Sequence, residues 1–111
     1  MYKSGDIVLI NFPFTDLTAS KVRPALVIAV RKEDIIVLGI FSRVPDTIDD
    51  SWFLLEEHVS WFTKTGLKKK SIIKTEKITV VHNSIVRKEI GKLPDNILVE
   101  VREKLRKTLC I

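Results

Sequence analysis

Arg23 is the residue of this chain whose type and position best suit phosphate chemistry. It stands between a polar stretch, residues 13–22, and an apolar run, residues 24–30. A buried strand would therefore anchor the base of its side chain, while the guanidinium could face a groove. The planar fork of donors can hold two phosphate oxygens at once. An ordinary exposed arginine at a strand end fits the same position, so the residue alone leaves both interpretations open.

Ser42 is a second candidate, because it directly follows another apolar run, residues 35–41. The short polar segment 32–34 joins this run to residues 24–30, which predicts two antiparallel strands. Arg23 and Ser42 would then lie at the same end of the sheet, opposite the connecting turn. A serine that simply ends the strand or turns the chain is the alternative interpretation.

A lysine-rich stretch follows Trp61 and Phe62. Lysines interspersed with aromatic rings can follow a phosphate backbone and stack a base. A solvated loop beside two aromatic residues of the core is the competing interpretation. The lysines concerned are Lys64, Lys68, Lys69, Lys70, Lys74 and Lys77.

Metal and cofactor chemistry has no support in the sequence. His58 and His82 are far apart, and the single cysteine, Cys110, can form neither an internal disulfide nor a cysteine-based metal cluster. The chain also lacks a glycine-rich phosphate loop and a nucleophile elbow. We therefore predict no metal and no cofactor.

The composition predicts one soluble domain, residues 1–111, because this length suits a single hydrophobic core. The formal net charge is +5, which raises the prior for an anionic partner. No apolar run approaches the ~18 uncharged residues that a spanning helix needs, and the first residues do not resemble a signal peptide. We expect a cytoplasmic protein that does not associate with a membrane.

The elements that must position these residues are mostly strands. Apolar and β-branched runs predict five of them, within residues 5–12, 24–30, 35–41, 52–55 and 71–81. Residues 13–22 and 42–50 are expected to be exposed loops, and residues 56–66 allow a short helical turn. A helix should follow Pro94 and bury one stripe, composed of Leu98, Val101, Leu105 and Leu109. The expected fold is mainly β with a C-terminal helix, in the form of a small barrel.

Several ordered motifs together resemble the MazF/PemK family of bacterial toxins. They read GDIVL at residues 5–9, FPFTD at 12–16, KVRPALVI at 21–28 and GLKKKS at 66–71, with further matches at 84–86 and 90–93. The resemblance implies an SH3-like barrel of the MazF/Kid/CcdB type that forms a homodimer. It also implies metal-independent cleavage of single-stranded RNA, leaving a cyclic phosphate and a 5′-hydroxyl, and inhibition by an acidic antitoxin.

The resemblance also assigns roles to individual residues. Arg23 matches the family's catalytic arginine, and Ser42 is the expected hydroxyl partner. The residues expected to contact RNA are Thr15, Asp16, Lys21, Lys69 and Lys74.

Two positions depart from the family's pattern. Many relatives carry a threonine where this chain has Phe41, and a glutamate in the loop where it has Thr18 and Ala19. These departures leave open a non-cleaving protein of the same fold. Such a protein would be either a toxin that poisons a protein target, as the related CcdB does with DNA gyrase, or a nucleic-acid-binding module.

Overall fold

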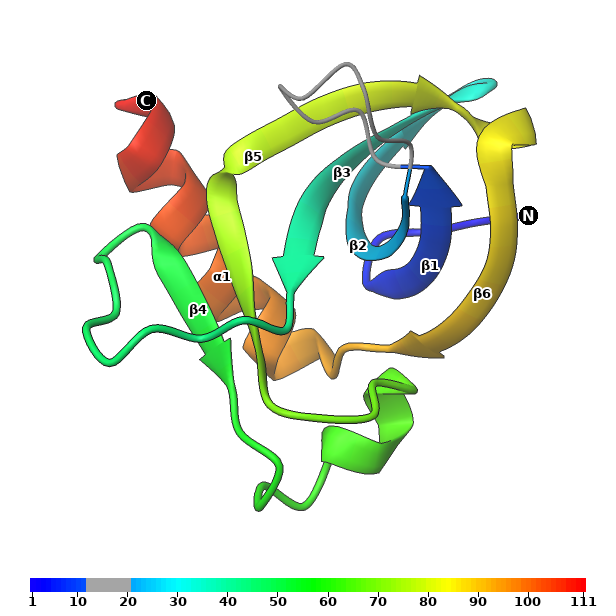
Figure 1. Cartoon of the computed structure of the whole chain (residues 1–111). Helices are drawn as coiled ribbons and strands as arrows, with labels where there is room; N and C mark the ends of the chain where they lie inside the picture. Colours follow the sequence, from blue (N-terminus) through cyan, green and yellow to red (C-terminus); the bar gives the residue numbers. More distant parts are fainter. Residues whose placement is uncertain (12–20) are drawn as a thin grey trace.

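The computed structural model describes residues 1–11 and 21–111 of the chain, and shows one antiparallel sheet followed by a helix (Figure 1). The strand order is β4-β5-β3-β2-β1-β6. The predicted mainly β fold with a C-terminal helix is thus confirmed. The strands are β1 (Asp6–Asn11), β2 (Val22–Arg31), β3 (Asp34–Phe41), β4 (Trp52–Leu55), β5 (Ser71–His82) and β6 (Val86–Lys92). The helices are the 3-10 turns η1 (Phe62–Thr65) and η2 (Asn83–Ile85), and the α-helix α1 (Asp95–Leu109).

The sheet curls strongly, with the long strands β5 and β6 arching around β1, β2 and β3 (Figure 1). The register between β3 and β5 shifts between the pairs Leu38–Ile78 and Gly39–Lys74. Three residues of β5, 75–77, are therefore extra at this point, and such a bulge bends a strand. The bend allows the first part of β5 to pair with the short strand β4 as well.

The two edge strands, β4 and β6, do not pair with one another among the described residues, so backbone hydrogen bonds do not close the sheet. Instead, η1 packs directly on β6. A Cβ atom at Gly66 would lie 2.0 Å from the carbonyl oxygen of Ile90, and one at Gly91 would lie 2.4 Å from that of Lys64. Only glycine allows two backbones to come this close.

The helix α1 seals one face of the sheet. Ile97, Leu98, Val101 and Leu105 are buried in the core, whereas Leu109 is 42% exposed. The predicted stripe is therefore right for three of its four members and wrong for Leu109. This leucine lies in the last helical turn, one residue before Cys110 ends the helix in a left-handed conformation.

The five predicted strands are all present, and η1 is the short helical turn expected within residues 56–66. The strand β6 was not predicted, although parts of it carry the family resemblance. Most of the expected loop 13–22 lies outside the described residues. No helix in the described part of the chain is long and apolar enough to cross a membrane.

Candidate active site

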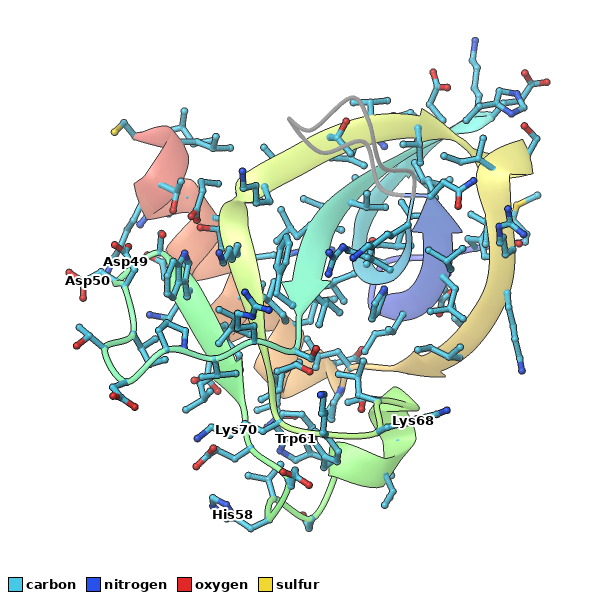
Figure 2. All side chains as sticks on the ribbon, in the orientation of Figure 1. Asp49, Asp50, His58, Trp61, Lys68 and Lys70 are labelled. Atoms are coloured by element: carbon cyan, nitrogen blue, oxygen red, sulfur yellow. The ribbon has the colours of Figure 1, made fainter. Side chains whose placement is uncertain are left out.

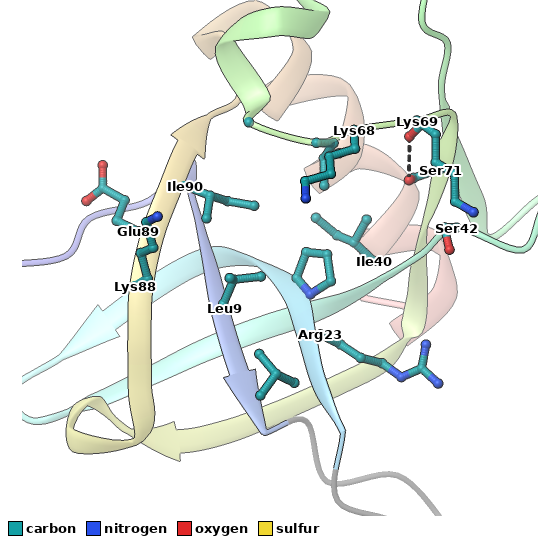
Figure 3. A pocket seen from close by; sticks show the side chains of 14 residues that line it. Leu9, Arg23, Ile40, Ser42, Lys68, Lys69, Ser71, Lys88, Glu89 and Ile90 are labelled. Atoms are coloured by element: carbon teal, nitrogen blue, oxygen red, sulfur yellow. Dashed lines mark hydrogen bonds between the residues drawn. The ribbon is translucent and has the colours of Figure 1, made fainter.

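A cavity of about 650 Å³ opens at the end of the sheet where β2 begins and β3 ends (Figure 3). Its apolar wall includes Leu9, Pro24, Ile40 and Ile90. Among the described residues, the charged lining is unbalanced, because four cationic side chains share it with one carboxylate. These are Arg23, Lys68, Lys69 and Lys88, against Glu89. The site therefore suits an anionic ligand.

Arg23 reaches this cavity from the second position of β2, a central strand that pairs with both β1 and β3. Its backbone is fixed opposite Ile10 of β1. The side chain is half-buried, and its guanidinium carbon lies 5.8 Å from the centre of the Phe41 ring. Arg23 is thus held at its base by the sheet and at its tip by an aromatic ring.

Ser42 lines the same cavity, directly after the end of β3. The sequence expectation that Arg23 and Ser42 lie at one end of the sheet is correct. In Figure 3, Ser42 lies near Lys69 and Ser71, and the Arg23 side chain extends below them toward the same side of the view. The Ser42 side chain is exposed and therefore accessible to a ligand.

The segment after η1 places Lys68 and Lys69 at the cavity. The buried hydroxyl of Thr65 donates to the carbonyl oxygen of Phe62 at 2.6 Å and accepts from the Leu67 N–H at 3.1 Å. The Ser71 hydroxyl donates to the carbonyl oxygen of Lys69 at 2.9 Å, as the dashed line in Figure 3 shows. These hydrogen bonds hold the backbone of the segment in place, while the side chains of both lysines are exposed.

The two aromatic residues before the lysines belong mainly to the core. Phe62 is buried, and Trp61 packs against the same hydrophobic cluster. Figure 2 shows Trp61 and Lys68 on neighbouring parts of the η1 region. Trp61 and Phe62 are therefore core aromatics beside a lysine-rich loop, which was one of the two interpretations. Lys68 and Lys69 of that loop nevertheless line the cavity.

Of the remaining predicted site residues, the structure describes Lys74 and Lys21. Lys74 does not line the cavity, but its ammonium lies 4.8 Å from the centre of the Phe41 ring that Arg23 also contacts. Lys21 is exposed just before β2. Thr15 and Asp16 lie outside the described residues.

Two groups of residues at this end of the sheet were missed from the sequence. Lys88 and Glu89 come from β6, which was itself not predicted. Trp52 begins β4, and the Lys74 ammonium lies 4.6 Å from the centre of its ring. Its indole N–H donates to Glu76 Oε2 at 2.8 Å.

The carboxyl group of Glu76 has a pKa below its ordinary value. Burial opposes its ionisation, but hydrogen bonds from Trp52, from its own backbone N–H and from Ser51, with the positive charge of Lys74, outweigh that effect. Glu76 is thus a carboxylate at neutral pH and can accept both side-chain hydrogen bonds.

Metal ligands do not gather in the described part of the chain, where no group of three or more His, Cys, Asp or Glu residues could hold an ion. His58 lies on the loop before η1 (Figure 2), and His82 ends β5.

Comparison with known proteins gives a consistent result. Residues 3–109 match the family described as PemK-like, MazF-like toxins of type II toxin–antitoxin systems. A MazF from Deinococcus radiodurans has a similar structure, with a TM-score of 0.75 and 20% identity, over 99% of this chain and 97% of that one. An endoribonuclease from a mycobacterial species, solved with its cognate antitoxin, gives a TM-score of 0.74 at 12% identity, over 100% and 97% of the two chains. No curated protein sequence matches the chain.

Proposed function

The chain belongs to the family of PemK-like, MazF-like toxins of type II toxin–antitoxin systems, and on that premise we propose that it is a metal-independent endoribonuclease. Its substrate would be single-stranded RNA, including mRNA, cleaved in the cytoplasm at selected sequences to stop growth. The observation that carries the proposal is the position of Arg23. It lines one cavity together with Ser42 and three lysines, and this lining suits an anionic ligand.

The reaction would use a nucleophile that the substrate itself supplies. The 2′-hydroxyl loses its proton and attacks the adjacent phosphorus, the bond to the 5′-oxygen breaks, and the departing oxygen gains one proton in return. The products are a cyclic phosphate and a 5′-hydroxyl. Negative charge builds on the phosphate oxygens during attack, and a guanidinium held in place stabilises that charge. Arg23 suits this role, because its guanidinium is held at the cavity by the base of β2 and by the Phe41 ring.

The other residues would bind and align the RNA. The Ser42 hydroxyl can form a hydrogen bond with the reacting group, and Lys69 can contact a neighbouring phosphate. We also assign RNA contacts to Lys74, to Lys21, and to Thr15 and Asp16 of the preceding loop. Contacts from the lysines to phosphates would position the substrate without reading its sequence.

Two protein partners belong to the proposal. One is an acidic antitoxin that occupies the cationic cavity, because a partly disordered acidic peptide can fold onto a surface built for RNA. The structural relatives solved with an antitoxin support this partner. The other is a second copy of the chain. Light scattering of the purified protein tests the homodimer, and salt dependence of antitoxin binding tests the charge argument.

The test of the proposed function is cleavage of a varied single-stranded RNA pool in the presence of a chelator. The parent should cut the pool, and Arg23→Ala should cut about 10²- to 10³-fold more slowly because a charge-stabilising donor is gone. Lys107→Ala removes an exposed positive charge on α1 and serves as the matched control. Mapping the fragment ends would give the preferred sequence and the end chemistry together.

If the parent protein leaves the RNA pool intact, the proposal that the chain is an endoribonuclease is wrong. Phe41, which stands where many relatives carry threonine, is the observation that favours a non-cleaving protein of this fold. Saturable RNA binding without cleavage would then indicate a nucleic-acid-binding module. Accumulation of cleaved DNA–gyrase complexes would instead indicate a toxin that poisons gyrase.

A further inference from the structure

Four side chains from four neighbouring strands form a row, and the first of them, Arg23, also lines the cavity. They alternate between cation and aromatic ring in the order Arg23 of β2, Phe41 of β3, Lys74 of β5 and Trp52 of β4. The guanidinium carbon of Arg23 lies 5.8 Å from the Phe41 ring centre, and the Lys74 ammonium lies 4.8 Å and 4.6 Å from the centres of Phe41 and Trp52. All three distances are within the range of attractive cation–π contacts.

The strand register explains why these four side chains meet. Lys74 pairs with Trp52 on one side and with Gly39 on the other. Gly39 has no side chain, so the Lys74 side chain is free to reach the ring of Phe41, two residues further along β3 and on the same face of the sheet. On its other side Gly39 pairs with Ala25, so Arg23 of β2 is across from Phe41.

The far end of the row is anchored. The Trp52 indole N–H donates to Glu76 Oε2 at 2.8 Å, and the Ser51 hydroxyl donates to Glu76 Oε1 at 2.9 Å. The single hydrogen of this hydroxyl is shared with Asp49 Oδ1, which lies 2.8 Å from the Ser51 oxygen. These bonds fix the plane of the Trp52 ring, and through it one side of the Lys74 ammonium.

We infer that Phe41 is a positioning residue, which holds the Arg23 guanidinium and the Lys74 ammonium on one aromatic ring so that both act on the same phosphodiester chain. The inference rests on the proposed function, because it gives the two cations an RNA substrate. Two like charges repel one another, and the electron-rich faces of a ring attract both. The Phe41 side chain has no group that can form an ordinary hydrogen bond, so it acts on the two cations through its ring.

This role distinguishes Phe41 from a residue that merely fills space. A leucine would keep an apolar side chain of similar reach but lose the ring, whereas a tyrosine would keep the ring. Phe41→Leu should therefore lower kcat for RNA cleavage about tenfold, and Phe41→Tyr should stay within about twofold of the parent. Tyr2→Leu removes a ring that packs against a separate hydrophobic cluster, which includes Val8 and Val27, and should leave cleavage unchanged.

A second measurement detects the contacts between the cations and the Phe41 ring without relying on catalysis. Protons that lie over an aromatic ring are shifted upfield in NMR spectra, so the Lys74 ε-methylene and Arg23 δ-methylene signals should be shifted in the parent and in Phe41→Tyr. In Phe41→Leu the Arg23 shift should be lost and the Lys74 shift reduced, because Trp52 remains. Thermal unfolding of each variant checks that the fold is intact.

The outcomes separate this inference from the proposed function. If the parent cleaves RNA and Phe41→Leu cleaves equally fast, the positioning role is wrong and the endoribonuclease stands. If the parent cleaves no RNA but the shifts depend on the ring at residue 41 as described, the row is real and the reaction assigned to it is wrong. Shifts that are the same in the parent and Phe41→Leu would overturn the row itself.

Discussion

Glu76 shows how a single carboxylate orders its surroundings at the residue scale. Its pKa is lowered because hydrogen bonds from Trp52 and Ser51 and the charge of Lys74 outweigh the effect of burial. A carboxylate whose pKa is lower in the folded state stabilises the fold at pH values above its unfolded pKa. That stabilisation is lost as the pH falls through the lowered, folded-state pKa.

Glu76→Gln should therefore be less stable than the parent at pH 7, by less than about 1 kcal/mol, because the side chain is largely exposed and an amide oxygen can still accept. The difference should shrink in acid, below the ordinary glutamate pKa of about 4.3. Urea denaturation at neutral pH and at about pH 3 measures it. Glu100→Gln on the exposed side of α1 is the control, and an equal loss at both pH values would contradict the assignment.

Residues joined by local topology could be predicted from the sequence, whereas those joined by non-local register could not. Arg23 and Ser42 flank two strands connected by a short turn, so their proximity follows from one hairpin. The contact between Phe41 and Lys74 depends on how β5 pairs with β3, and that register shifts by three residues at the bulge. Phe41 therefore seemed only to be a departure from the family, although its ring contacts two cations.

At the scale of elements, the contact between η1 and β6 positions part of the site. Gly66 and Gly91 allow the two backbones to touch, and the segment that follows η1 carries Lys68 and Lys69 to the cavity. Gly66 also has a φ of 73°, a conformation that side chains disfavour. The lysines are thus placed by a backbone contact rather than by contacts of their own side chains.

Gly91→Ala should lower the free energy of unfolding by about 1–3 kcal/mol, since the new methyl group would meet backbone atoms of Lys64 and Thr65 at 2.3–2.4 Å. It should also weaken RNA binding, because η1 must shift and take the lysines with it. Chemical denaturation and an RNA-binding titration measure the two effects. Lys64→Ala, an exposed change in η1, should alter stability by less than about 0.5 kcal/mol. If the Gly91→Ala protein is as stable as the parent, η1 can move away from β6 without a loss of stability.

The strand β6 was not predictable because its hydrophobic pattern is weak. Its middle holds three consecutive charged residues, Arg87, Lys88 and Glu89, and these side chains are exposed. An edge strand can carry such residues because only one of its sides pairs with a neighbour, here β1. In contrast, the five predicted strands include β1, β2 and β3, whose buried β-branched residues form the centre of the sheet.

For the molecule as a whole, the net charge of +5 predicts an anionic partner but does not locate it. The fold concentrates part of this charge, since the described lining of the cavity holds four cations and one carboxylate. Binding of single-stranded RNA should therefore weaken as salt rises, because each neutralised phosphate releases counterions. The steepness of that dependence counts the phosphate contacts.

Lys69→Ala should reduce the slope of log affinity against log salt by about 0.7, the value for one contact to a single strand. Lys107→Ala removes the same charge from the exposed side of α1 and should leave the slope unchanged. The measurement uses a 2′-O-methyl oligonucleotide, which lacks the attacking hydroxyl, between about 50 and 200 mM salt. Equal slopes for both variants would mean that the RNA senses only the overall charge, and the cavity would then not be its binding site.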